Sequence, residues 1–213
     1  MHCVVFFTNM NPQLAITSSM ILSGASGCGK SFWILKLISE ANNIIIPQPE
    51  RIIYCYTEYQ PMFDDFTNVQ FIEGLPEMNL FDGKQPTLLV LDDLMSATND
   101  NVSDLFTRIS HHHNVFVVYI TQNLFHKSKQ NRTMSLNAHY IVLFKNPRDA
   151  TQVATLGRQM YPGKSKFLIE AFKDATQKPY GYLFLDMKPE TEEIYRVRTN
   201  IFPNERQYVY LPK

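Results

Sequence analysis

Short apolar runs alternate with segments of helical period along most of the chain. The runs at 88–91 and 115–120 have no charged interruption, which is typical of strands buried on both faces of a parallel sheet. The alternation therefore predicts an α/β fold with a mostly parallel sheet flanked by helices. The predicted strands are 19–23, 51–56, 69–72, 88–92, 115–121 and 140–144, and the predicted helices are 32–38, 101–111, 148–160 and 164–173.

The C-terminal region departs from this alternation. Residues 182–185 and 195–198 predict two strands that form a closing hairpin or an edge pair. Residues 123–137 are polar and predict a loop or a short helix. Because no repeat, low-complexity segment or linker interrupts the chain, we expect a single domain over 1–213. Its core would span 15–145, and 146–213 would add C-terminal helices and edge strands.

A glycine-rich segment joins the predicted strand at 19–23 to the helix that follows it. It matches G-x-x-x-x-G-K-[ST] at every position, through Gly24, Ala25, Ser26, Gly27, Cys28, Gly29, Lys30 and Ser31. Such a loop turns its backbone N–H groups inward around phosphates, and the helix adds the positive end of its dipole. Lys30 would reach the β- and γ-phosphates, and the Ser31 hydroxyl would ligate Mg²⁺. The strand and helix on either side disfavour a chance glycine-rich turn, so we expect ATP and Mg²⁺ as ligands.

Polar residues follow two of the predicted buried strands. Asp92 and Asp93 end the strand at 88–92, as in a Walker B segment, and Gln122 follows the strand at 115–121. Asp92 would hold Mg²⁺, and Asp93 would act as general base on the attacking water. Many related ATPases have the longer Glu at the second position, and Asp93 as a cap of the next turn is the alternative. Gln122 would sense the γ-phosphate or orient water. With the alternating pattern, these motifs predict a P-loop NTPase of the additional-strand, RecA-like type.

Composition excludes several classes of protein. The 213 residues are 45% hydrophobic and 19% charged, as in a globular domain, and the formal net charge is +0. Any contact with nucleic acid must then be local, since the whole chain does not attract DNA or anionic membranes. The apolar runs fall far short of the ~20 residues that span a bilayer, and the N-terminus lacks the basic start of a signal peptide. Three cysteines without C-x-x-C spacing indicate a reducing interior, where Cys28 is a candidate oxidant-sensitive thiol.

Three further features have competing explanations. The run at 111–113 is all histidine, but consecutive side chains diverge around a helix, so a helix end or subunit contact is favoured over zinc. The basic stretch at 126–132 predicts either a loop that faces DNA phosphates or a solvated loop. Phe32 and Trp33 follow the phosphate-binding loop and are expected in the core.

The chain resembles the FtsK/HerA superfamily of ring-forming DNA-pumping ATPases. The resemblance lies in a helix with arginine at 106–108, the buried strand that ends in Thr-Gln at 121–122, and the segment 136–142. More narrowly, the chain is similar to the poxvirus-type genome-packaging ATPases, above all those of adenovirus-like viruses and Maverick/Polinton elements. The likeness runs from about residue 20 to 202, and its narrower motifs are 122–125, Arg132, 135–137, 143–149 and 196–203.

The resemblance implies ATP hydrolysis at the subunit interfaces of a homo-oligomeric ring that translocates double-stranded DNA into a capsid. It also implies a capsid protein as partner. No membrane is expected as a partner, because the apolar runs are too short to span a bilayer. A neighbouring subunit's arginine would complete each site, and such arginine fingers contribute ~10³–10⁵ in rate. Arg108 is the candidate, with Arg132 and then Arg148 as alternatives, and a solvated helix arginine is the competing explanation for Arg108. The resemblance does not fix the compartment. An intracellular protein is expected, and the host nucleus and association with the virion are both open alternatives.

Other functions are compatible with the phosphate-binding loop. A small-molecule kinase shares it, but the chain has no arginine-rich lid segment, and the Asp-Asp and Thr-Gln pairs favour hydrolysis by water. A GTPase is disfavoured because no N-K-x-D segment is present. A non-catalytic subunit that binds nucleotide only to assemble is the third alternative.

Overall fold

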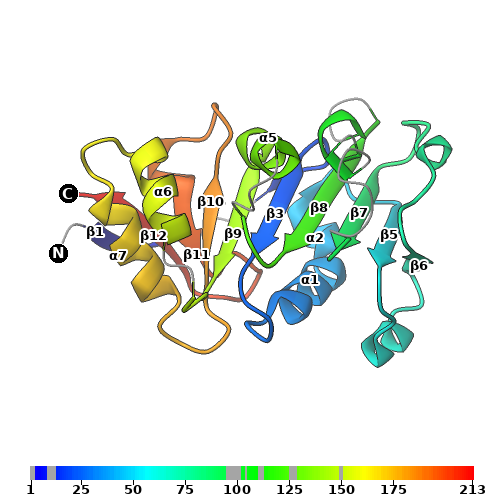
Figure 1. Cartoon of the computed structure of the whole chain (residues 1–213), viewed down its shortest axis with the longest axis horizontal. Coiled ribbons are helices and arrows are strands. Elements are labelled where there is room, and N and C mark those ends of the chain that lie inside the picture. Colours follow the sequence, from blue (N-terminus) through cyan, green and yellow to red (C-terminus); the bar gives the residue numbers. More distant parts are fainter. Residues whose placement is uncertain are drawn as a thin grey trace.

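A computed structural model describes residues 3–8, 13–94, 102–103, 105–109, 113–124, 129–148 and 151–213. For 3–8, 108 and 129–131 it describes the backbone alone. A ten-stranded sheet runs through the whole molecule, with helices on both faces (Figure 1). In sheet order its strands are β1 (Cys3–Thr8), β12 (Gln207–Pro212), β11 (Val197–Thr199), β10 (Tyr182–Asp186), β9 (Tyr140–Phe144), β3 (Ser19–Ser23), β8 (Val115–Thr121), β7 (Thr87–Asp92), β5 (Arg51–Tyr56) and β6 (Gln70–Glu73).

Neighbouring strands from β9 to β6 are parallel, which confirms the prediction of a mostly parallel core. The strand β8 pairs with β3 on one side and with β7 on the other. It therefore separates the strand before the glycine-rich loop from the strand that ends in Asp92. That order is the additional-strand arrangement expected from the motifs. A separate short sheet pairs β2 (Leu14–Ala15) with β4 (Ile45–Ile46).

The remaining four strands are antiparallel and extend the sheet beyond β9. The predicted pair of 182–185 with 195–198 is present as β10 and β11, but two details were wrong. Tyr195 and Arg196 belong to α8 (Glu193–Arg196), and the pair is internal because β12 and β1 lie beyond it. The partner of β1 is at the far end of the chain, with Cys3 opposite Pro212, so local sequence could not place it.

The two faces of the sheet each pack into a separate hydrophobic layer. Met20 and Leu22 pack on the side that α1 (Lys30–Ser39) and α2 (Ala41–Ile44) cover, whereas Ile21 packs on the other. The second side is covered by η3 (Leu105–Ile109), α5 (Lys129–Asn137), α6 (Thr151–Met160) and α7 (Lys166–Ala175). Short 3₁₀ turns, η1 (Pro61–Asp65) and η2 (Met78–Leu80), flank β6 in the chain.

The predicted helices exist with shifted ends. The predicted face of 102, 105, 106 and 109 is buried as expected, although η3 has π-helical geometry and 101, 104 and 110–112 are outside the described residues. The polar stretch at 123–137 contains a helix, α5. None of the helices within the described ranges is long and apolar enough to cross a bilayer.

Phe32 corrects an expectation. Trp33 is buried against the sheet, but Phe32 is 71% exposed. The stripe of α1 that faces the sheet contains Trp33, Ile34, Leu37 and Ile38, and the helical period turns Phe32 away from it.

Candidate functional site

The glycine-rich loop connects β3 to α1 in a conformation that depends on glycine. Gly27 and Gly29 have φ of +74° and +104°, in the left-handed region that disfavours other residues. Gly24 is needed for space, because a Cβ there would lie 2.6 Å from Cβ of Phe144 and 2.8 Å from Sγ of Cys28. The loop is anchored to the sheet by the Gly24 N–H, which donates to the Thr121 carbonyl at 3.3 Å.

The first turn of α1 presents backbone donors to the loop. The N–H of Trp33 donates to the Gly29 carbonyl at 2.9 Å. The N–H groups of Lys30, Ser31 and Phe32 precede that first helical bond and are therefore the open donors of this helix end. Together with the helix dipole they form a site that favours an anion.

Lys30 folds back over the loop. Its Nζ donates to the carbonyl oxygens of Gly24 at 2.7 Å and Ala25 at 3.0 Å. The ammonium group is thus held above the loop by neutral acceptors. Burial raises the pKa of the neighbouring Cys28 thiol, although the Lys30 charge acts in the opposite direction. The raised pKa disfavours the reactive thiolate.

Asp92 ends β7 half-buried beside the loop. The hydroxyl of Tyr54, on the adjacent strand β5, donates to Oδ2 of Asp92 at 2.7 Å. Burial raises the pKa of Asp92, and the Asp93 charge adds to this, whereas the Tyr54 hydrogen bond and Lys30 lower it. Burial and the Asp92 charge raise the pKa of Tyr54, so its hydroxyl remains a donor.

Asp93 and Gln122 meet at the ends of neighbouring strands. Asp92 lies opposite Ile120 in the β7–β8 register, which brings the residues that follow both strands together. The Gln122 Nε2 donates to Oδ2 of Asp93 at 3.5 Å. Asp93 is exposed and has φ of +50°, a left-handed conformation that is uncommon for residues other than glycine.

One cleft of about 330 Å³ gathers most of these groups. Of the predicted site residues, Ser26, Gly27, Lys30, Ser31, Asp92, Asp93 and Gln122 line it. The outer face of the loop, with Ala25 and Cys28, borders a different hollow, and Gly29 borders a third.

Sequence reasoning missed the contribution of β5. Tyr54 contacts Asp92, and Tyr56, Thr57, Glu58 and Gln60 line the cleft from the end of the same strand. The strand itself was predicted at 51–56. Its place beside β7 follows only from the sheet order, and that order makes its polar end part of the site.

Among the described residues that line the cleft, Lys30 is the sole lysine or arginine. Arg132 lies exposed on α5, and Arg148 lies exposed after β9. Arg108 lies in η3 with only its backbone described. The structure therefore places neither Arg132 nor Arg148 in this lining, and the side chain of Arg108 lies outside the described residues.

Two other expectations fall largely outside the described residues. His111, His112 and the loop at 125–128 are not described. Within the part of the chain that is described, no group of three or more His, Cys, Asp or Glu side chains could hold a metal ion.

Comparison with known proteins identifies the fold. No protein-family model and no curated protein sequence matches the chain. The structure is similar to that of the genome packaging NTPase B204 from Sulfolobus turreted icosahedral virus 2. Its complex with sulfate aligns with a TM-score of 0.54 and 14% identity, over 82% of this chain and 93% of that one. Its complex with ATP-gammaS gives a TM-score of 0.54 and 15% identity, over 85% and 96%. The chain therefore has a P-loop NTPase fold that is shared with a viral packaging NTPase.

Proposed function

We propose that this protein is an ATP-hydrolysing translocase that packages the double-stranded DNA of a virus or virus-like element into a capsid. The cleft carries the proposal, because it combines a phosphate-binding loop with the carboxylates of Asp92 and Asp93 and the amide of Gln122. The fold shared with the B204 packaging NTPase supports the choice among P-loop functions. The resemblance to the FtsK/HerA superfamily and to adenovirus-like and Maverick/Polinton packaging ATPases supports the same choice.

Phosphate binding follows from the loop and from Lys30. The Nζ of Lys30 is held by the carbonyls of Gly24 and Ala25, and a phosphate oxygen is a stronger acceptor for an ammonium group. Lys30 would therefore exchange these carbonyls for the β- and γ-phosphates, while the N–H groups of the loop and of α1 hold the phosphate chain.

The donors in the cleft suit a magnesium ion. The Ser31 hydroxyl and the Asp92 carboxylate line the same cleft, and Mg²⁺ prefers oxygen ligands. Tyr54 donates to Oδ2 of Asp92, and this hydrogen bond fixes the orientation of the carboxylate that would bind the ion. When bound, Mg²⁺ would neutralise charge on the β- and γ-phosphates.

Hydrolysis requires a group that positions and deprotonates water. Asp93 is exposed in the cleft, and Gln122 holds its carboxylate through the 3.5 Å hydrogen bond. We assign Asp93 as general base and Gln122 as the residue that orients the water or senses the γ-phosphate. Glu58 lines the cleft from β5 and is the alternative carboxylate.

A ring would supply the missing positive charge. Transferred phosphoryl groups are stabilised by a second cation, and Lys30 is the sole lysine or arginine in the described lining. An arginine from a neighbouring subunit, with Arg108 as first candidate, would complete the site. In this proposal 15–145 form the nucleotide-binding core, and 146–213 add the C-terminal helices and strands. The ring binds to a capsid protein.

The proposal is tested by ATP hydrolysis with and without long double-stranded DNA, with oligomeric state measured in parallel. We expect DNA-stimulated release of free phosphate from a ring, and no nucleotide binding by Lys30→Ala. A phosphorylated acceptor instead of free phosphate would show a kinase. Tight ATP binding without turnover, with or without DNA, would contradict the motor and favour a non-catalytic assembly subunit.

A further inference from the structure

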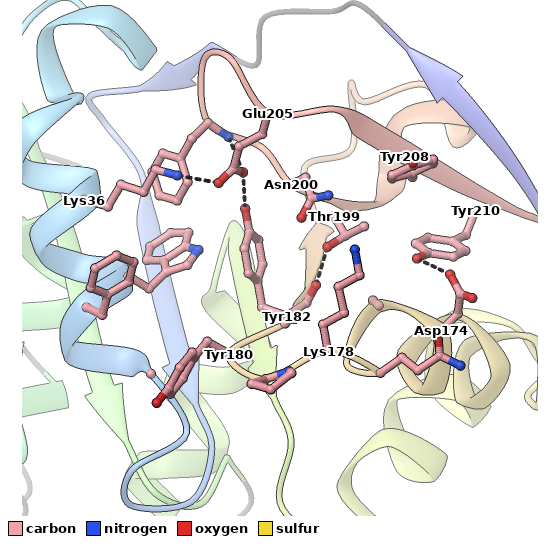
Figure 2. A pocket seen from close by; sticks show the side chains of 18 residues that line it. Lys36, Asp174, Lys178, Tyr180, Tyr182, Thr199, Asn200, Glu205, Tyr208 and Tyr210 are labelled. Atoms are coloured by element: carbon pink, nitrogen blue, oxygen red, sulfur yellow. Dashed lines mark hydrogen bonds and ion pairs between the residues drawn. The ribbon is translucent and has the colours of Figure 1, made fainter.

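A second hollow, of about 360 Å³, lies on the other side of α1 from the cleft. Its walls come from α1, from the segment between α7 and β10, and from the C-terminal strands (Figure 2). One part of its lining is polar, since Lys36 pairs with Glu205 and the Tyr182 hydroxyl donates to Glu205 at 3.4 Å. Its rim toward the glycine-rich loop is aromatic, with Phe32 and Tyr180.

The hollow and the cleft meet at the start of α1. Lys30 and Ser31 face the cleft, whereas Gly29, Phe32, Trp33 and Lys36 line the hollow. The second set has the i, i+3, i+4, i+7 spacing of a single helix face. The Phe32 N–H is one of the open donors of the helix, and its side chain borders the hollow. Because the consecutive residues Gly29 and Lys30 border the hollow and the cleft, a phosphate chain bound at Lys30 with its γ end near Asp93 would have its other end close to the hollow.

Tyr180 lies directly over the loop. A Cβ built on Gly29 would be 2.9 Å from Cδ1 of Tyr180, so the ring packs against the loop backbone. The side chain is nonetheless 67% exposed, which leaves much of the ring uncovered. Figure 2 shows it at the end of the hollow nearest the loop.

The backbone of Tyr180 is held in an unfavourable conformation. Its φ is +61°, a region that bulky residues avoid and that costs about 1–2 kcal/mol. The next residue is fixed as glycine, because a Cβ on Gly181 would lie 2.4 Å from the Ala175 carbonyl oxygen. Strain of this kind tends to persist where the side chain is needed in a particular place.

We infer that the hollow receives the base and ribose of the bound nucleotide, with the base stacked on the exposed ring of Tyr180 beside Phe32. This inference rests on the proposed nucleotide binding and adds the half of the site that the phosphate motifs do not describe. Aromatic stacking suits a base because every base has a π-face. Glu205 and Asn200, which also line the hollow, then offer hydrogen-bond partners to the base edge or the ribose hydroxyls.

The test compares a ligand that has a base with one that has none. Calorimetric titration with ATP and with inorganic tripolyphosphate, each with Mg²⁺, is carried out on wild type, Tyr180→Phe, Tyr180→Ala and Tyr180→Asn. Asn tolerates left-handed backbone, so it separates loss of the ring from relief of strain. We expect about tenfold weaker ATP binding by the Ala and Asn variants, unchanged tripolyphosphate binding, and wild-type values for Tyr180→Phe.

Tyr195→Ala is the matched control, because Tyr195 lines neither the cleft nor the hollow. Equal ATP affinity in wild type and Tyr180→Ala would overturn the inference. So would an equal loss for ATP and tripolyphosphate, which would indicate damage to the loop. Wild-type protein that binds neither ligand would overturn the proposed function, and this inference with it.

Discussion

The hydroxyl of Tyr54 donates a 2.7 Å hydrogen bond to Oδ2 of Asp92, across the neighbouring strands β5 and β7. The Tyr54 ring is fixed by Phe63 and Phe71, with ring centroids 5.0 and 5.6 Å away. The carboxylate proposed to hold Mg²⁺ is thus oriented by a rigid aromatic cluster on one side of the sheet.

Tyr54→Phe removes this hydrogen bond and keeps the ring contacts. Because the bond lowers the pKa of Asp92, its loss raises that pKa further and favours the protonated carboxyl. We expect the variant to need more Mg²⁺ for hydrolysis and its rate to fall roughly 10-fold or more. The acidic limb of its pH–rate profile should shift to higher pH. Mg²⁺ titrations of the ATPase rate across pH measure this. Tyr161→Phe removes a hydroxyl that donates to Glu193 outside the lining of the cleft and should behave as wild type. An unchanged Tyr54→Phe profile would contradict the prediction.

Asp92→Asn should stabilise the protein without ligand. Burial raises the pKa of Asp92 in the folded state, so the ionised carboxylate destabilises the fold once pH rises through that value. The amide oxygen still accepts the Tyr54 hydrogen bond but carries no charge. We expect a melting temperature higher by a few degrees at pH 7, at ~2–4 °C per kcal/mol, and a gap that closes toward pH 4. Thermal unfolding without nucleotide or Mg²⁺ measures the gap. If Asp92→Asn is instead less stable than wild type at pH 7, the folded protein stabilises the ionised Asp92 carboxylate enough to offset its burial.

Asp93→Asn separates binding from turnover. The exposed amide leaves the loop, Lys30 and Asp92 intact, so ATP should bind normally while hydrolysis falls by ~10²–10⁴. Single-turnover hydrolysis and ATP affinity are measured on the same preparation. Glu58→Gln is the comparison, since Glu58 lines the cleft from another strand. Equal hydrolysis by Asp93→Asn and wild type would remove Asp93 from the mechanism, and a loss confined to Glu58→Gln would assign the base to Glu58.

Arg108→Ala should impair hydrolysis at the ATP site of the neighbouring subunit. A pure variant ring should lose ~10³-fold or more in rate, as for other arginine fingers. Rings that mix Arg108→Ala with Asp93→Asn subunits should recover part of the activity, because each defect affects a different partner of the interface. Arg132→Ala tests the alternative, and Arg158→Ala, which alters an exposed residue of α6, is the control. Wild-type rate in a pure Arg108→Ala ring would exclude Arg108.

A buried ion pair should stabilise the pairing of β10 with β11. Arg198 Nη2 lies 3.3 Å from Oδ2 of Asp186, and both side chains are nearly inaccessible. Arg198→Met leaves the carboxylate unpaired and should destabilise the protein by ~3–5 kcal/mol at neutral pH. The loss should shrink at low pH, since burial already raises the pKa of Asp186 and removal of Arg198 raises it further. Urea unfolding measures both, and Arg198→Met/Asp186→Leu should recover most of the loss. No recovery would assign the effect to packing.

The elements of the core and the phosphate loop could be predicted because their signals are local. The strand at 19–23 was predicted with its observed bounds, since an apolar run, three glycines and an amphipathic helix follow one another within a short stretch. Failures occur where local sequence is ambiguous. Phe32 is as apolar as Trp33, and only the direction in which α1 packs decides which of them is buried.

The sequence by itself determined the phosphate-binding motif, the strand and helix alternation, and the residue types at the strand ends, because each depends on neighbours in the chain. Tertiary structure decided which strand ends meet. The order β3-β8-β7-β5 places Gln122 beside Asp93 and Tyr54 beside Asp92, and the C-terminal strands bring Tyr180 over Gly29. These contacts join segments far apart in the chain. The packing of the whole sheet selects them, and no local pattern of hydrophobic and polar residues encodes that choice.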